Sequence, residues 1–155
     1  MGLIMTHFRL FLFLFLLLPQ YGFANYNVDE IKTNILKNST VFKVSDWVKD
    51  SNKPLWKAKT ALKRVKIKVS DKKSEIISPF IGRKQTRNAK QLCTEFASIV
   101  LGTNEEEERK KIKLAIKKST TRHHVRYFTT RNLRFSVAPI LVGGLVSLHC
   151  IVEKQ

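Results

Sequence analysis

The side chains best suited to acid–base chemistry are two histidines near the C-terminal end, His124 and His149. Imidazole accepts and donates protons near neutral pH without any perturbation of its pKa. Beside an anion-binding Arg126 or Arg134, two imidazoles would suit the acid–base cleavage of a phosphodiester. The alternative is that both histidines are ordinary exposed residues of a basic surface, in which case neither is catalytic.

Other signatures of enzymatic or metal-binding sites are missing from the sequence. We find no glycine-rich phosphate-binding loop, no zinc-ligand spacing and no Ser/His/Asp arrangement. The four consecutive acids at 105–108 project around a helix instead of converging on an ion, and they suit the N-terminal end of that helix. We therefore predict no metal site and no cofactor.

The histidines would be positioned by a three-stranded antiparallel meander over residues 122–152. Gly143-Gly144 lies between two apolar runs and predicts a two-residue hairpin turn. This turn pairs Val137 with Cys150 and puts the apolar residues of both strands on one face. Residues 135–152 are uncharged and nearly long enough to span a membrane, but their paired glycines, proline and β-branched residues favour strands.

The first strand of the meander joins the hairpin if residues 130–132 form a three-residue loop. Tyr127 would then lie opposite Phe135, and the apolar residues of all three strands would share a face. The same register places both histidines across from Ala138 on the other face. A small side chain between them would let the imidazoles reach a common substrate.

Cys93 and Cys150 are the two cysteines of the chain. Apolar residues at helical spacing over 89–101 put Cys93 on the buried stripe of a helix, and Cys150 lies on the apolar face of the hairpin. An even number of cysteines in an exported protein favours a disulfide over a metal site or a nucleophile. The predicted bond would stabilise the fold by roughly 4 kcal/mol.

The N-terminus has the three-part pattern of a secretory signal peptide. An apolar block at 10–18 follows His7 and Arg9, and the small residues Gly22 and Ala24 suit a signal peptidase. We predict cleavage of residues 1–24 and a single basic domain over 25–155, secreted or periplasmic and without a membrane span. Asn38 begins an N-glycosylation triplet, which matters only in a eukaryotic source.

The remaining patterns complete an α+β fold, an antiparallel sheet that ends in the meander, with helices packed on its apolar face. Thr103 and Glu106 predict a capping box for the last helix. The expected elements are helices at 28–36, 54–63, 89–101 and after Thr103, and strands at 41–48, 64–69 and 75–81.

The chain is strongly basic, with 29 Lys and Arg against 12 Asp and Glu and a formal charge of +17. Such an excess attracts polyanions, although a lysine-rich composition alone would also produce it. Trp47 and Trp56 could offer stacking surfaces for bases or sugars, or lie in the core. The residues predicted to bind anions are Arg64, Lys66, Lys68, Arg126 and Arg134.

These observations favour an exported, non-enzymatic binding protein whose basic surface engages an anionic polymer or surface, either a glycan, a nucleic acid or lipid head groups. A protein partner is compatible with the same surface. Two alternatives remain open from the sequence. One is a small secreted basic hydrolase that acts on nucleic acid, and the other is a structural subunit of an envelope assembly.

Overall fold

The computed structural model describes residues 26–103 and 105–155, so the predicted signal peptide lies outside the described residues. Seven antiparallel strands form one sheet in the order β1-β2-β3-β4-β7-β6-β5. The strands are β1 (Val44–Lys49), β2 (Leu55–Thr60), β3 (Lys66–Ser70), β4 (Lys73–Pro79), β5 (Arg126–Thr130), β6 (Leu133–Val142) and β7 (Leu145–Lys154). The helices are α2 (Val28–Lys37), α3 (Ser39–Phe42), α4 (Gly82–Leu101) and α5 (Glu106–Arg122).

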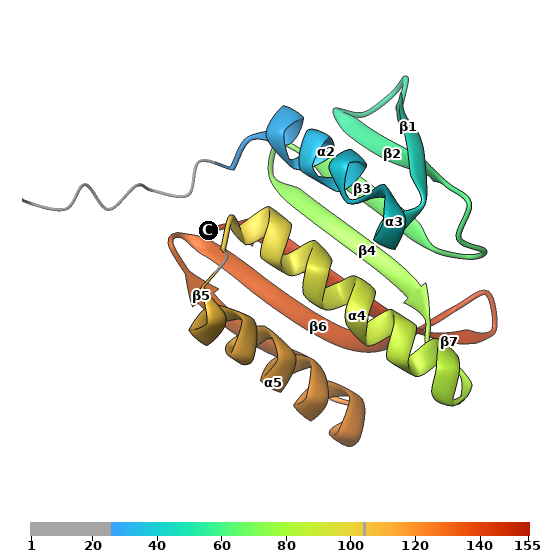
Figure 1. Cartoon of the computed structure of the whole chain (residues 1–155), viewed down its shortest axis with the longest axis vertical. Coiled ribbons are helices and arrows are strands. Elements are labelled where there is room, and N and C mark those ends of the chain that lie inside the picture. Colours follow the sequence, from blue (N-terminus) through green and yellow to red (C-terminus); the bar gives the residue numbers. More distant parts are fainter. Residues whose placement is uncertain (1–25, 104) are drawn as a thin grey trace, which may run out of the picture.

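The helices cover one face of the sheet (Figure 1), as the sequence predicted. α4 packs on β4 and β7, α5 packs on β5 and β6, and α2 packs on β1, β3 and α4. Alternate residues of the strands face this layer, so apolar side chains such as Ile67, Ile76 and Phe135 are buried in one core together with Phe96 of α4. None of the helices of residues 26–103 and 105–155 lies on the opposite face, which we call the open face. No helix of the described part of the chain is long and apolar enough to span a membrane.

The C-terminal hairpin has the predicted register. Val142 lies opposite Leu145, Val137 opposite Cys150, and the turn glycines Gly143-Gly144 both have positive φ. Cys150 therefore faces α4, where it forms the predicted disulfide with Cys93 at a Cα–Cα distance of 5.9 Å. The bond ties the helix layer to a central strand of the sheet.

The predicted register of β5 is wrong by one residue. Arg131 and Asn132 form a two-residue turn with φ of 48° and 63°, so Phe128, not Tyr127, lies opposite Phe135. An arginine in the left-handed region is disfavoured by roughly 1–2 kcal/mol. Here Arg131 forms an ion pair with Glu105 at 2.9 Å, and this contact across the chain helps to hold the turn.

The segment predicted as a helix at 54–63 is the strand β2. Its sequence alternates, with Trp56 and Ala58 facing the helix layer and Lys57 facing the open face. Pairing with β1 and β3 on both sides satisfies its backbone, so the strand forms despite the helix-initiating position of Pro54.

Other predicted boundaries shift. Residues 39–42 are a single helical turn, so the strand expected at 41–48 begins at Val44, and α4 begins at Gly82. The N-cap of α5 is Glu105 and makes no side-chain capping bond, so the predicted capping box is absent. The Thr103 hydroxyl accepts a hydrogen bond from the Glu105 N–H at 3.3 Å instead.

Candidate anion-binding surface

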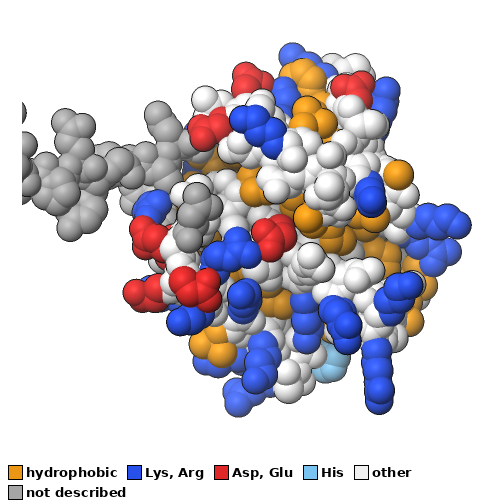
Figure 2. Space-filling view, viewed as in Figure 1, with side chains coloured by type: hydrophobic (Ala, Val, Ile, Leu, Met, Phe, Trp, Pro, Cys, Tyr) orange, Lys and Arg blue, Asp and Glu red, His pale blue; other side chains and the backbone are white. Residues whose placement is uncertain are grey.

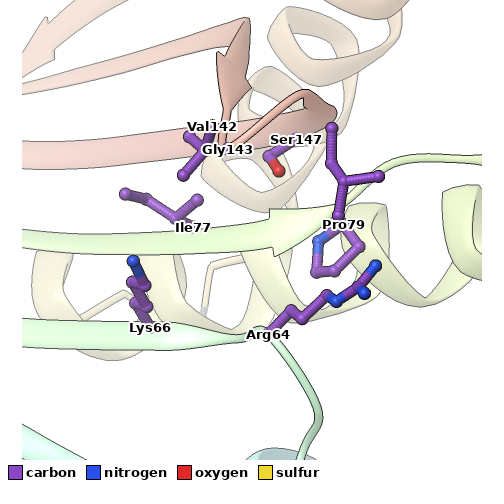
Figure 3. Close-up of a pocket in the computed structure, with 8 residues that line it drawn as sticks. Arg64, Lys66, Ile77, Pro79, Val142, Gly143 and Ser147 are labelled. Carbon is purple, nitrogen blue, oxygen red and sulfur yellow. The ribbon is translucent and has the colours of Figure 1, made fainter.

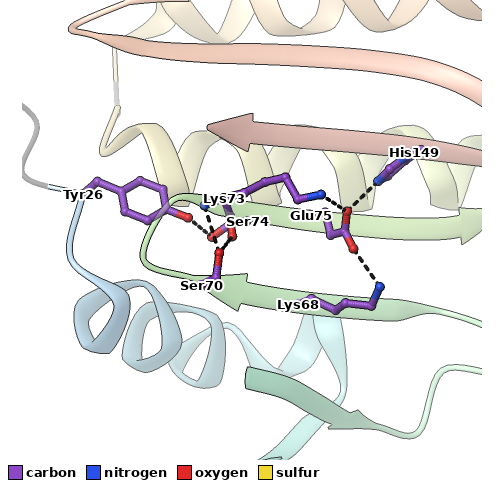
Figure 4. Close-up of polar contacts among 7 residues, drawn as sticks. All are labelled: Tyr26, Lys68, Ser70, Lys73, Ser74, Glu75 and His149. Carbon is purple, nitrogen blue, oxygen red and sulfur yellow. Dashed lines mark hydrogen bonds and ion pairs between the residues drawn. The ribbon is translucent and has the colours of Figure 1, made fainter. Parts of the chain in front are cut away.

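His149 lies on the open face, where it belongs to a charged cluster that joins three strands (Figure 4). Its Nε2 lies 3.1 Å from Oε2 of Glu75 on β4. Lys68 of β3 donates to the other oxygen of the same carboxylate at 2.8 Å, and Lys73 lies 3.1 Å from Oε2. Glu75 is therefore surrounded by three basic side chains while only 7% of its surface is exposed.

These partners stabilise the charged form of Glu75. The hydrogen bond with His149 is the largest influence, and it acts with Lys68 and Lys73 to hold the pKa of the carboxyl far below its ordinary value, against the opposite effect of burial. A carboxylate so fully engaged is a poor proton acceptor near neutral pH. The cluster therefore links β3, β4 and β7. Lys68, one of the predicted anion-binding residues, is paired with Glu75 in it.

The second predicted histidine is not part of this cluster. His124 is exposed in the connection between α5 and β5, outside the strand. In the observed register the position opposite Ala138 would be 125, not 124, so the alignment of His124, Ala138 and His149 is not formed. Among the described residues no group of three or more His, Cys, Asp or Glu side chains could hold a metal ion.

The register shift also separates the two predicted anion-binding arginines. Arg126 lies opposite Val137 and so faces the helix side, whereas Arg134 lies on the open face. Arg134 stacks over the Tyr127 ring at 4.4 Å, and its Nε lies 3.9 Å from the Glu153 carboxylate. Of the two predicted anion-binding arginines, only Arg134 therefore shares a face with His149.

Arg64 and Lys66 lie together at one end of the open face (Figure 3). Arg64 is in the turn before β3, with φ 63°, and Lys66 is the first residue of the strand. Both line a shallow pocket of about 260 Å³ with residues of β4 and of the β6–β7 hairpin. None of the described residues that line this pocket is acidic.

The tryptophans do not provide an open stacking platform. Trp47 is buried in the core. Trp56 faces the helix layer, where the Lys32 ammonium group of α2 lies 3.6 Å from the centre of its ring. Trp47 is therefore a core residue, and the ring of Trp56 is covered by a cation–π contact with Lys32.

Many basic side chains also lie on the two long helices, α4 and α5. α4 and α5 lie side by side (Figure 1) and run antiparallel, held near their connection by Arg109, whose Nη2 donates to Glu95 at 2.8 Å. The N-terminal half of α4 therefore lies beside the C-terminal half of α5. We call eight of their nine exposed basic residues the basic helical surface: Arg83, Lys84, Arg87, Lys110, Lys113, Lys117, Lys118 and Arg122. The ninth, Lys111, is excluded because it forms an ion pair with Glu107 at 2.9 Å.

Charge is segregated along this pair of helices (Figure 2). Acidic side chains gather at the α4–α5 connection, and basic ones spread over α5 and the N-terminal half of α4. Within the described ranges, no residue of the basic helical surface takes part in an ion pair. Arg83 and Lys84 lie in the first turn of α4, where the helix dipole also disfavours cations.

Sequence reasoning missed this surface because it treated the two helices separately. A signal was present, since residues 110–152 contain no acid and neither do residues 76–94. Only the antiparallel packing of the helices turns two basic segments into one surface.

Comparisons with protein-family models, curated proteins and solved structures found no match.

Proposed function

We propose that the protein is an exported, non-enzymatic binding protein whose basic helical surface engages an anionic partner. The observation that carries the proposal is the segregation of charge, with eight exposed cations outside every ion pair of the described residues. Like charges at such density repel one another, and an anion that binds there relieves the repulsion. The predicted signal peptide and the disulfide support an oxidising compartment, secreted or periplasmic.

The alternative of a hydrolase depended on the predicted register of β5, which differs from the observed one by one residue. It required two imidazoles on one face with a shared substrate, and His149 instead contacts Glu75 while His124 lies outside β5. Arg126, one of the two arginines offered as its anion clamp, faces the helix side of the sheet, away from His149. The residues proposed for acid–base catalysis are therefore not brought together, and binding is the function we propose.

Salt dependence of binding to heparin, duplex DNA and phosphatidylglycerol vesicles tests the proposal. If anions bind through counterion release, affinity for at least one of these probes falls steeply with salt. Reversing two charges, Arg87→Glu with Lys117→Glu, should weaken that binding at least tenfold and reduce the salt slope.

The matched control carries the same change in net charge at two exposed lysines of the strand turns, Lys53→Glu with Lys72→Glu. This variant should bind nearly as well as the wild type. Equal losses in the two variants would mean that net charge alone attracts the partner, and the proposed surface would be rejected. Binding to none of the three probes would reject the function itself.

A further inference from the structure

The tip of the β6–β7 hairpin is apolar on both of its faces. Leu141 and Val146 lie opposite each other on the helix side, and Val142 and Leu145 form the next pair on the other side. Leu141 is 72% exposed and Val146 41% exposed. A strand at a protein surface ordinarily alternates between apolar and polar residues, so apolar pairs on both sides of one tip require a separate explanation.

The apolar surface continues onto the segment that leads into α4. The Phe80 N–H donates to the Val146 carbonyl at 2.9 Å, so this segment lies against the hairpin. The next residue, Ile81, is 45% exposed. Three of the seven exposed large apolar side chains of the described residues therefore gather at one end of the molecule.

Basic side chains surround this tip on both sides of the sheet. Arg64 and Lys66 line the pocket on the open face, together with Val142, Gly143 and Leu145 of the hairpin (Figure 3). On the helix side, Ile81 and Gly82 are followed directly by Arg83 and Lys84, which begin the basic helical surface. No acidic residue occurs in the described segments that form the tip, 80–90 and 136–152.

We propose that this end of the protein binds an anionic lipid bilayer, with the hairpin tip inserted among the head groups. The apolar tip would reach the boundary of the acyl chains, while Arg64, Lys66 and the first turn of α4 bind lipid phosphates. A bilayer surrounds an inserted hairpin on all sides, so it matches a tip that is apolar on both faces. A protein groove or a nucleic acid would cover one side and leave the other apolar pair in water.

This inference rests on the proposed function, because it names the anionic partner of the same basic surface. The test uses protein purified after expression of the full chain in an exporting host. Co-sedimentation measures its partition onto phosphatidylcholine vesicles with and without phosphatidylglycerol, and heparin binding is measured in parallel. We expect binding only to the vesicles that contain the anionic lipid.

The tip variant Leu141→Ser with Val146→Ser should lose at least about tenfold in partition onto anionic vesicles, because two apolar side chains no longer leave water. Its heparin affinity should stay within about twofold of the wild type, since the basic residues are retained. The matched control, Leu114→Ser with Val125→Ser, removes two apolar side chains elsewhere that are 50% and 59% exposed, and it should bind vesicles normally.

A second measurement covers the case in which the tip variant does not fold. In Leu141→Trp, the new indole should shift its emission to shorter wavelength with anionic vesicles and be quenched by brominated acyl chains. The wild type provides the background, because Trp47 is buried and Trp56 is covered by Lys32. An unchanged emission would overturn the insertion of the tip.

The outcomes separate the two proposals. Binding to heparin or DNA without binding to anionic vesicles would overturn the membrane inference and leave the proposed function intact. Vesicle binding that the tip variant retains in full would also overturn the inference, because charge alone would then account for it. Failure to bind any of the anionic probes would reject both.

Discussion

Replacing Glu75 by glutamine should destabilise the protein by about 2 kcal/mol near neutral pH. Hydrogen bonds to charged groups contribute roughly 1.5–3 kcal/mol each, and breaking a fully buried ion pair costs about 3–5 kcal/mol. Glu75 is buried, but Lys68 and Lys73 are partly exposed and can regain water, so we expect a value below that upper range. Glutamine keeps the shape of the side chain, so the loss reports the charge.

The effect should depend on pH in a defined direction. The pKa of Glu75 is lowered in the folded state, so its contribution to the free energy of unfolding is complete above its unfolded pKa of about 4.3. That contribution is lost as pH falls further toward the folded pKa. The difference between wild type and Glu75→Gln should therefore shrink as the pH falls below about 4.

Urea unfolding of both proteins over this pH range measures the difference directly. The matched control is Glu153→Gln on the same open face, where the carboxylate is half-exposed and lies 3.9 Å from the Arg134 Nε. Exposed pairs contribute little, so the control should change stability by less than about 0.5 kcal/mol. A Glu75→Gln loss as small as the control, or one independent of pH, would refute the role assigned to the cluster.

Two further predictions test the register of β5 and the burial of a phenol. Phe128→Ala should destabilise the protein by about 2 kcal/mol, because the Phe128 ring centre lies 5.4 Å from that of Phe135. Tyr127→Ala should cost about 0.5 kcal/mol, with both values measured by urea unfolding. The reverse order would favour the register predicted from the sequence. Tyr26→Phe removes the hydrogen bond to Ser74 and should lower the free energy of unfolding by about 1 kcal/mol at neutral pH. Burial raises the pKa of Tyr26 to about 12 in the folded state. Above about pH 10 the tyrosine ionises in the unfolded wild type but not in its folded state, so the wild type loses stability and the deficit of the variant relative to it should shrink. A deficit that stays constant between about pH 9 and 11, followed by urea unfolding, would contradict that burial.

Patterns confined to one or two neighbouring elements predicted much of the fold. The turn glycines Gly143-Gly144 determined the hairpin register, because only a two-residue turn lets both apolar runs share a face. Helical spacing around Cys93 and strand alternation around Cys150 are both local, and together they predicted the disulfide. Each inference depends on a period that the residues themselves carry.

Elements that depend on distant partners were mispredicted. β2 forms between β1 and β3, and its short alternating sequence also fits a helix that starts at Pro54. The register of β5 depends on Arg131 in a left-handed turn, which an acid of the α5 N-terminus helps to hold. The sequence alone does not indicate that an arginine adopts a left-handed conformation, because the contact with Glu105 forms only in the folded protein. The predicted pairing of His124 with His149 was a consequence of the wrong register.

The sequence by itself determined the excess of positive charge, the two cysteines and the apolar periodicities, because these are properties of composition and of neighbouring residues. The tertiary structure decided where the charge lies. Antiparallel packing brings the N-terminal half of α4 beside the C-terminal half of α5, so two separate basic segments form one surface while the acids gather at the helix connection. Coulomb interactions depend on distance in space, and distance between remote residues is set only when the helices pack on the sheet.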